Sequence, residues 1–383
     1  MDRKTIVMKN ILITGGAGFI GSNLTIKLVK EGYNVTILDN LSQQIHGKNQ
    51  ESQLFTSIKD ISDFILGDVC NKSDWEKALK GQDAVIHLAA ETGTGQSMYE
   101  ITRYNEVNIL GISHLLDTLA NKNHSIKKMI IASSRSIYGE GKYYCKQDGH
   151  VYPVDRKEKD LLQGAFEPRC PICKSKLELK PTDELSKIHP SSIYGITKHQ
   201  QEQMIMLMGK ALNIPAVALR YQNVYGPGQS LSNPYTGILS VFSTILLNGN
   251  DIEIYEDGQE TRDFVYIDDV VNATTMALEK DEANHKVFNV GYGLAISVNE
   301  VARKLHDLYK SSGNITISGK FRLGDIRHNY ADLTKIKATL GFIPEIDFKT
   351  GVTRFAKWVK TQGIQEDKYE KSIEELKQKG LIK

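Results

Sequence analysis

The 383-residue chain is long enough for one large two-lobed unit or about two to three small domains. With 40% hydrophobic and 25% charged residues it has an ordinary globular composition, and its net charge of +2 gives no reason to expect binding to nucleic acid or acidic membranes. The first ten residues lack the apolar core of a signal peptide, and no run of about 18 apolar residues occurs, so we expect a cytoplasmic protein.

The first predicted elements lie in the segment ILITGGAGFIG at residues 11–21. A short β-branched run passes directly into four glycines (Gly15, Gly16, Gly18 and Gly21) and then into an apolar-periodic stretch at residues 24–29. This order predicts a strand, a tight turn and a helix whose first N–H groups face a pyrophosphate. A structural glycine turn without a ligand is the alternative.

A second predicted strand, YNVTIL at residues 33–38, ends in Asp39, about 20 residues after the glycine turn. An acid at this position accepts hydrogen bonds from an adenosine ribose. Because Asp39 would repel a 2′-phosphate and neither Asn40 nor Leu41 is a cation, we expect NAD and not NADP.

Further strands and helices alternate along the chain after a polar stretch at residues 40–62, for which we expect a loop and at most a short helix. We expect strands at residues 63–66, 84–88 and 129–132, and a long helix at about 99–119 that carries Asn108. Asp68 either meets the adenine amino group or starts the next helix. The alternation predicts an α/β fold with a doubly wound parallel sheet, whose ligands lie at the carboxyl ends of the strands.

The segment SSIYGITK places Tyr194 and Lys198 four residues apart, on one face of a predicted helix. A tyrosine with a pKa of about 10 is a poor base at neutral pH, but a nearby ammonium favours its phenolate. Where this spacing arises by chance, the two residues usually lie on a solvent-exposed face of a helix. After a glycine turn, Asp39 and a strand that ends in Ser133 and Ser134, it indicates a catalytic pair.

The chain resembles the extended short-chain dehydrogenase/reductase family, in particular its nucleotide-sugar epimerases and dehydratases. The resemblance rests on TGGAGFIG, LDN, HLAA, SSRSIYG, YGITK, RYQNVYGPGQ, RDFVYIDDV and RLGDIRH, which occur in this order. It implies that Tyr194 is the base, that Ser134 hydrogen-bonds the sugar oxygen, and that Lys198 holds the nicotinamide ribose. It also implies that Asn223, Arg262 and Arg322 bind a diphosphate.

We therefore predict two sets of binding residues. The cofactor set is Gly15, Gly18, Phe19, Ile20, Gly21, Asp39, Asn40, Asp68, Val69, Leu88, Ala89, Ala90, Asn108, Tyr194 and Lys198. The substrate set is Glu91, Thr92, Ser134, Arg135, Asn223, Arg262, Arg322 and Asp325. Guanidinium groups suit phosphate oxygens. Weak surface pairs of Arg262 with Asp263 or Asp268, and of Arg322 with Asp325, are the alternative.

The residues after Ser134 bear on the reaction. In 4,6-dehydratases of the family an Asp and a Glu follow the catalytic Ser or Thr, whereas Arg135 and Ser136 stand here. The sequence therefore favours a redox-neutral 4-epimerase, and longer strings such as HLAAETGTGQSMYEI are most similar to bacterial dTDP-L-rhamnose 4-epimerases. Another UDP-sugar epimerase, an NAD-dependent keto-sugar reductase and a non-catalytic NAD sensor are the alternatives.

A cysteine-bearing insertion at about residues 141–182 separates Ser134 from Tyr194. The CPIC spacing of Cys170 and Cys173, with Cys145, predicts a structural zinc knuckle, and His150 is the best fourth donor. The resembled epimerases carry Cys or His at the position of Asp148, which weakens this prediction. A metal-free loop with spare thiols is the alternative.

The predicted domains are an NAD-binding Rossmann domain at residues 1–225 and a smaller substrate-binding lobe at 226–362, from which 260–273 return to the core. The charged tail at 363–383 is expected to be an exposed helix without a catalytic role. Apolar positions on the helices at 99–119 and 194–212 suit a homodimer, and equally suit core burial.

Overall fold

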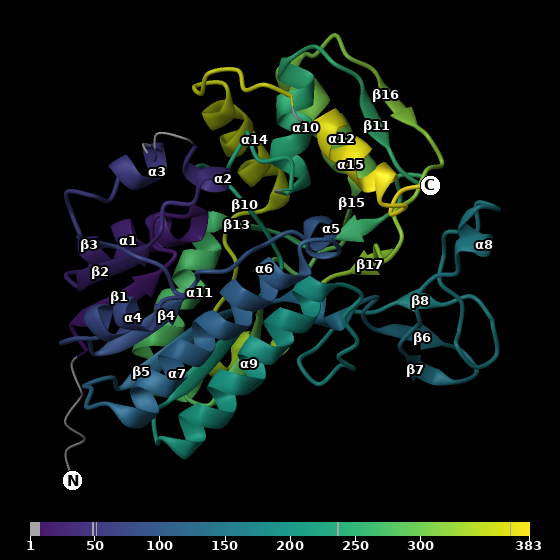
Figure 1. The fold of residues 1–383 in the computed structure, drawn as a ribbon. Coiled ribbons are helices and arrows are strands. Elements are labelled where there is room, and N and C mark those ends of the chain that lie inside the picture. Colours follow the sequence, from purple (N-terminus) through teal and green to yellow (C-terminus); the bar gives the residue numbers. More distant parts are fainter. Residues whose placement is uncertain (1–7, 48–49, 51, 236, 368) are drawn as a thin grey trace.

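Seven parallel strands form the central sheet, in the order β14-β9-β5-β4-β1-β2-β3 (Figure 1). The structure is a computed structural model that describes residues 8–47, 50, 52–235, 237–367 and 369–383. The strands are β1 Asn10–Thr14, β2 Asn34–Asp39, β3 Asp63–Leu66, β4 Ala84–His87, β5 Lys128–Ser134, β9 Ala216–Tyr221 and β14 Lys286–Val290. Because β1 pairs with β2 on one side and β4 on the other, the chain reverses its direction of winding there, and the crevice opens at this point.

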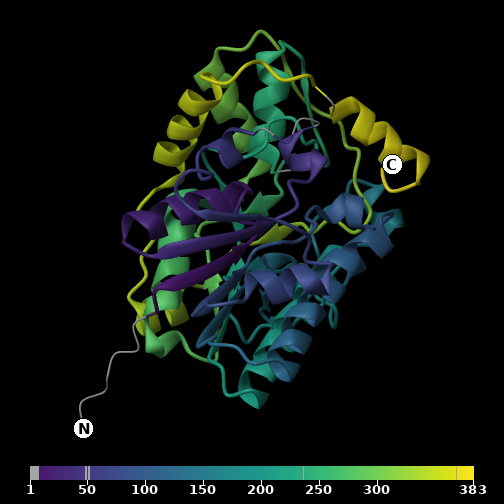
Figure 2. The same ribbon diagram turned by 60° about the vertical axis from the view of Figure 1, so that its left-hand side comes forward.

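Helices cover both faces of the sheet (Figure 2). On one face Ile11 and Ile13 pack with α1 (Phe19–Lys30) and α11 (Ile267–Glu279). On the other face Leu12 packs in the core that contains the helices α4 Lys72–Ala78, α7 Gly111–Asn121 and α9 Ile193–Ala211. This alternation along β1 is what two-sided burial of a parallel strand requires. The predicted doubly wound α/β fold is confirmed.

The long helix predicted at 99–119 is interrupted. It consists of α6 (Ile101–Asn105), one π-helical turn (Glu106–Leu110) and α7. The polar stretch at 40–62 contains two short helices, α2 (Gln43–His46) and α3 (Gln53–Thr56). The remaining short helices near the sheet are α5 Thr94–Ser97 and the 3₁₀ turns Arg135–Tyr138 and Asp281–Ala283.

The C-terminal lobe sits above the carboxyl ends of the strands (Figure 1). Its helices are α10 Ile238–Leu247, α12 Val298–Tyr309 and α14 Phe348–Val359, whereas α13 Thr334–Leu340 packs against the edge strand β14. Its strands are β10 Asn223–Tyr225, β11 Ile252–Ile254, β12 Thr261–Arg262, β13 Phe264–Tyr266, β15 Ile296–Ser297, β16 Ile315–Ile317 and β17 His328–Asn329. The return to the sheet is longer than the predicted 260–273, because all of α11 covers the sheet and β14 forms its edge.

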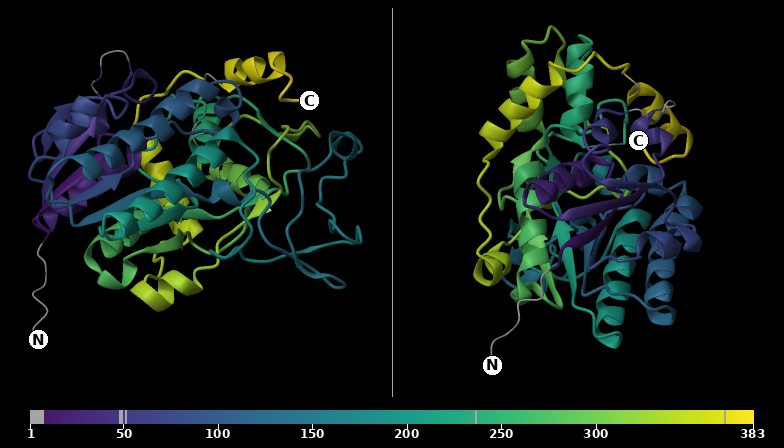
Figure 3. Two further views of the ribbon diagram at one scale, coloured as in Figure 1. Left: turned by 60° about the horizontal axis from the view of Figure 1, so that its bottom comes forward. Right: turned by 90° about the vertical axis from the view of Figure 1, so that its left-hand side faces the viewer.

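The insertion projects from the body of the molecule (Figure 3) and carries its own small antiparallel sheet, which is labelled in Figure 1. This sheet contains β6 Tyr143–Cys145, β7 Gly149–Val151 and β8 Glu178–Leu179, and the short helix α8 (Glu158–Leu161) follows β7 in the chain. Among the helices of the described residues, none combines the length and apolarity that a membrane crossing needs.

The C-terminal tail is more than the exposed helix expected from its charge. In α15 (Tyr369–Gln378) and beyond, Ile373, Leu376 and Ile382 are buried and pack with Tyr99 and Tyr255. The last residues pair antiparallel with Phe321–Leu323, where the N–H of Phe321 donates to the carbonyl of Lys383 at 2.9 Å. The tail is therefore part of the folded C-terminal lobe.

Candidate active site

The glycine turn after β1 has no room for side chains. Gly15 has φ +68°, and a Cβ on it would lie 2.7 Å from the backbone nitrogen of Ala89 at the exit of β4. A Cβ on Gly21 would lie 2.3 Å from the carbonyl oxygen of Gly15, so only glycine lets α1 start this close to the turn. The N-terminus of α1 thus opens toward a narrow cradle that fits the pyrophosphate of a dinucleotide.

Asp39 lies at the end of β2, beside this turn. Its two carboxylate oxygens accept hydrogen bonds from the backbone N–H of Ala17 at 3.0 Å and of Leu41 at 2.9 Å. Burial raises the pKa of Asp39, which these hydrogen bonds and the nearby His46 oppose. The side chain is therefore held rigidly where an adenosine ribose would meet it.

Helix α9 places Tyr194 and Lys198 opposite Ser134. Ser192 caps the helix by accepting a hydrogen bond from Gly195 N–H at 3.1 Å, and Gly195 itself permits close approach, because a Cβ there would lie 2.7 Å from the carbonyl of Ser136. The cap and the glycine together press the first turn of α9 against the end of β5. Tyr194 therefore forms a hydrogen bond with Ser134, while Lys198, one turn later, donates to Gln201 at 2.7 Å.

The protonation of the two helix residues is set by burial. Burial raises the pKa of Tyr194, while a hydrogen bond with Ser134 and the charge of Arg135 act against the rise. Burial lowers the pKa of Lys198 to about 7, against the attraction of Glu202. A cationic nicotinamide would favour the phenolate of Tyr194, the form in which it can accept a proton.

One cavity of about 590 Å³ joins nearly all of the predicted residues. Its lining includes every predicted cofactor and substrate residue except Asp68 and Asn108. Asp68 accepts a hydrogen bond at 2.9 Å from Asn40, which lines the cavity. Asn108 is buried in the π-helical turn, where it bonds both backbone groups of Glu91 and the hydroxyl of Thr197. Both residues support the cavity wall and are not part of it.

Three guanidinium groups line the substrate end of this cavity. Arg135 donates to Asn223 at 2.6 Å, and burial, with the charge of Arg262 as the next cause, lowers the pKa of Arg135 to about 9. Arg262 is buried and pairs with Asp325 at 2.8 Å, not with Asp263 or Asp268 as the surface alternative held. The concentration of positive charge in one partly buried space suits a doubly charged diphosphate.

Arg322 reaches the same cavity from the strand-like segment that pairs with the tail. It donates to the hydroxyl of Tyr369 at 3.0 Å and lies over the ring of Tyr255, 5.1 Å from its centroid. The predicted alternative pair with Asp325 is not formed, because Asp325 contacts Arg262. The Nε of Arg322 is buried and without a hydrogen-bond partner within the described part of the chain, so it can bind an anionic ligand.

Several residues that shape the site carry no local sequence signal. Glu202, one turn after Lys198, binds Arg220 on β9 and accepts a hydrogen bond from Ser133 at 2.6 Å. From the tail, Glu375 accepts a hydrogen bond at 2.7 Å from Tyr235, which lines the cavity. The i, i+4 spacing could have suggested that Glu202 lies near Lys198, but no local pattern points to Arg220, Ser133 or Glu375.

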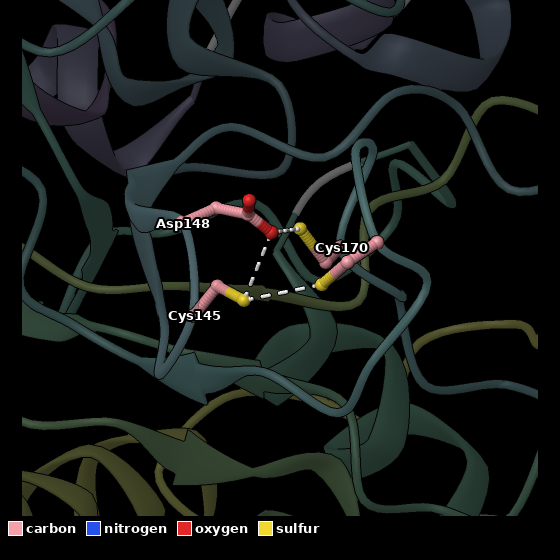
Figure 4. A group of neighbouring side chains, drawn as sticks. Cys145, Asp148 and Cys170 are labelled. Carbon is pink, nitrogen blue, oxygen red and sulfur yellow. Dashed lines mark hydrogen bonds between the residues drawn. The ribbon is translucent and has the colours of Figure 1, made fainter.

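The three cysteines predicted as metal ligands converge in the insertion (Figure 4). His150 lies outside their group, exposed and with its ring against that of Tyr144. Asp148 takes its place, with a carboxylate oxygen 3.3 Å from the sulfur of Cys145 and 3.1 Å from that of Cys170. The fourth residue predicted from donor chemistry is thus corrected from His150 to Asp148.

The model of the NAD-dependent epimerase/dehydratase family matches residues 11–291. This chain belongs to that family. A dTDP-L-rhamnose 4-epimerase from Burkholderia thailandensis is 36% identical over 92% of this chain and 95% of its own length. The family membership confirms the resemblance drawn from the sequence motifs.

Two solved structures of similar proteins contain nucleotide sugars. A UDP-N-acetylglucosamine 4-epimerase from Methanobrevibacter ruminantium, in complex with UDP-N-acetylmuramic acid, is 30% identical with a TM-score of 0.74, over 94% of this chain and 100% of that one. A UDP-glucuronic acid 4-epimerase from Bacillus cereus, in complex with UDP-glucuronic acid and NAD, is 26% identical with a TM-score of 0.75, over 92% and 99%. The fold is therefore that of the epimerases in this family.

Proposed function

We propose that this protein is a nucleotide-sugar 4-epimerase that uses bound NAD without net redox change. The observation that carries the proposal is the single cavity in which the glycine turn, the pair Tyr194 and Lys198, and three guanidinium groups meet. The name of the Burkholderia relative supports dTDP-L-rhamnose as the substrate and dTDP-6-deoxy-L-talose as the product. The coarser assignment, a nucleoside-diphosphate sugar, is supported by the three guanidinium groups of the cavity and by the UDP-sugars bound in the two similar solved structures.

The protein residues perform the proton transfers. Tyr194 accepts the proton of the hydroxyl on sugar carbon 4, and Ser134 holds the same oxygen by a hydrogen bond. Bound NAD would supply the hydride acceptor for carbon 4 and, as NADH, the hydride donor for the opposite face. Lys198, beneath Tyr194 on α9, stabilises the phenolate and positions the nicotinamide ribose.

The substrate end of the cavity provides the anchor that inversion needs. Arg262, Arg322 and Asn223 hold the diphosphate, while the 4-keto sugar turns about its link to the phosphate and presents its other face. A doubly charged group between guanidinium donors is bound more firmly than a neutral sugar ring. The arrangement therefore permits rotation of the sugar without release of the nucleotide.

The residues after Ser134 support epimerisation over elimination of water. Arg135 donates to Asn223 at 2.6 Å, and the Ser136 hydroxyl donates to Ser134 at 2.9 Å. Elimination needs an acid for the leaving hydroxyl and a base for the carbon-bound proton. Neither a guanidinium nor a serine hydroxyl already bonded in this way supplies that pair.

The test uses purified protein without added cofactor. Incubation with dTDP-L-rhamnose is expected to give the talose epimer, followed by the proton NMR signals at carbon 4, with no net NADH. UDP-glucose and UDP-glucuronic acid, run in parallel, decide the sugar and the base. Stoichiometric consumption of external NADH by a keto sugar would instead establish a reductase, and no turnover of any nucleotide sugar would refute the proposal.

We further propose a homodimer formed through α6 and α9. Leu207 on α9 and Ile101 on α6 are 69% and 48% exposed, although each is a large apolar side chain. A second copy of the chain would cover this face. Leu207→Glu is expected to yield monomers in light scattering, while Leu185→Glu, which changes a 95% exposed leucine just after the insertion, leaves the dimer intact. A monomeric wild type contradicts the proposal.

Finally, we propose that the insertion binds a structural zinc ion in addition to the NAD in the cavity.

A further inference from the structure

Four potential metal ligands from two separate turns meet inside the insertion. Cys145 ends β6, Asp148 lies in the turn before β7, and Cys170 and Cys173 belong to a later turn. Their donor atoms all lie within 4.8 Å of one another, and the sulfurs of Cys145 and Cys173 are 3.5 Å apart. Figure 4 shows Asp148 pointing toward the sulfurs of Cys145 and Cys170. Zinc–sulfur bonds of about 2.3 Å in a tetrahedron place neighbouring sulfurs about 3.8 Å apart. The observed spacing is close to that of a zinc site.

The insertion has too little apolar core to hold these turns together. Its core consists of Tyr143, Cys145, Val151 and Cys170, so two of its four buried members are cysteines of the group. Units of this size usually need a metal or disulfides. A metal ion between the two turns would supply the missing cross-link, because it connects the hairpin at 145–148 to the turn at 170–173.

The strand geometry explains why Asp148 and not His150 belongs to the group. Tyr144 and His150 are paired across β6 and β7, and their rings pack on each other with centroids 5.4 Å apart. Side chains alternate between the two faces of a strand, so Cys145 points to the face opposite that of Tyr144. His150 is therefore on the outer face, whereas Asp148, in the turn, reaches both buried sulfurs.

We propose that Cys145, Asp148, Cys170 and Cys173 bind one structural zinc ion, and that this ion positions the substrate-binding segment 322–328 through Glu167. Three thiolates and one carboxylate fit tetrahedral zinc by number and type. Structural sites of this kind are closed, with no position for a substrate, so the ion is expected to act on the fold and not on the reaction.

The link from the ion to the cavity is short. Glu167 lies three residues before Cys170 and accepts a hydrogen bond from Arg327 Nε at 2.7 Å. It also contacts His328 at 3.3 Å. The carbonyl of Arg327 in turn accepts a hydrogen bond from Arg262 at 3.0 Å, and Arg262 pairs with Asp325 in the cavity. A shift of the turn at 170–173 would therefore move the cavity residues.

A second contact from the same stretch strengthens this link. Phe166 packs with Phe321 and with Leu161 of α8, and its ring lies beneath the guanidinium of Arg327. Phe321 is the residue before Arg322. The insertion thus contacts the substrate-binding segment at both of its ends, through one charged group and one apolar cluster.

The metal is tested on the full-length protein, purified without chelator after expression with added zinc. Elemental analysis is expected to give one zinc per chain, and Cys173→Ser to lose it, while the matched control Cys70→Ser keeps it. His150→Ala is expected to keep the zinc, Asp148→Asn to lose it faster to a chelator, and Asp148→Cys to retain it. Zinc well below one per chain, or a Cys145–Cys173 disulfide in protein purified without oxygen, would overturn the site.

The positioning role is tested separately with Glu167→Gln, which leaves all four ligands in place. The variant is expected to keep its zinc, its NAD and its kcat, but to raise KM for the nucleotide sugar about tenfold, the effect of one charge-assisted hydrogen bond. An unchanged KM would overturn the role of Glu167. This part rests on the proposed epimerase function, whereas zinc content does not, so a wrong substrate assignment leaves the metal result standing.

Discussion

Replacing Tyr194 by phenylalanine tests the proposed base with little disturbance of the fold. The substitution removes only the hydroxyl. Its hydrogen-bond partner Ser134 keeps the bonds it accepts from Ser136 N–H, at 3.1 Å, and from the Ser136 hydroxyl, at 2.9 Å. The ring keeps its edge-on packing against Tyr104, with centroids 6.4 Å apart. The Ser134 hydroxyl loses Tyr194 as the acceptor of its proton, but Ser134 lines the cavity, where water can accept that hydrogen bond, so we expect a stability loss of about 1 kcal/mol.

The activity loss should be much larger than the stability loss. A positioned base contributes about 10² to 10⁴ in rate, which corresponds to about 2.7–5.4 kcal/mol of activation free energy. The assay is epimer formation by proton NMR, with the bound NAD measured after denaturation. Tyr309→Phe is the matched control, because it removes a hydroxyl that bonds Ser243 at 2.8 Å, away from the cavity. Turnover of Tyr194→Phe near that of the wild type would refute the assignment of the base.

Three further predictions follow from the geometry. Gly21→Ala forces a backbone contact at 2.3 Å and should lower NAD affinity about tenfold or more, whereas Gly363→Ala, with free space around it, should bind NAD like the wild type in calorimetry. Burial lowers the pKa of Lys198 to about 7, whereas an unfolded lysine has a pKa of about 10.4. Between these two pH values the unfolded chain binds more protons than the folded chain, so the free energy of unfolding rises with pH. In urea unfolding of NAD-free protein, Lys198→Met should remove this rise. Glu375→Gln weakens the hydrogen bond from Tyr235 and should raise KM for the nucleotide sugar about threefold to tenfold. The control Glu374→Gln changes an exposed neighbour and should leave KM unchanged. Equal KM values for the two variants would contradict a role of the tail.

The parts of the site that the sequence predicted are those fixed by local spacing. The glycine turn needs positive φ and close backbone approach at set positions, so it leaves a readable pattern at Gly15 and Gly21. Tyr194 and Lys198 share a helix face by their separation of four. In both cases the distance along the chain determines the distance in space, and all four residues line the same cavity.

The parts that the sequence missed depend on register and on contacts between distant segments. His150 is the better zinc donor by chemistry, but the pairing of β6 with β7 turns it to the outer face. The partner of Arg262 is Asp325, 63 residues later, and not the adjacent Asp263. Asp263 is buried and instead accepts hydrogen bonds from the backbone of Tyr292 and Gly293. No local pattern distinguishes the partners of Arg262 and Asp263, because these contacts join segments that are far apart in the sequence.

The segment 322–328 shows why such distant contacts matter for the proposed reaction. The insertion holds it through Glu167 and Arg327, the tail pairs with Arg322, and Arg262 binds Asp325. Inversion at carbon 4 requires a sugar that turns and a diphosphate that does not. A segment fixed from three directions gives up little further conformational freedom on binding, so its charged groups can hold the diphosphate firmly. The sugar remains free to rotate at the other end of the cavity, where each of its two faces must in turn approach Tyr194 and the nicotinamide.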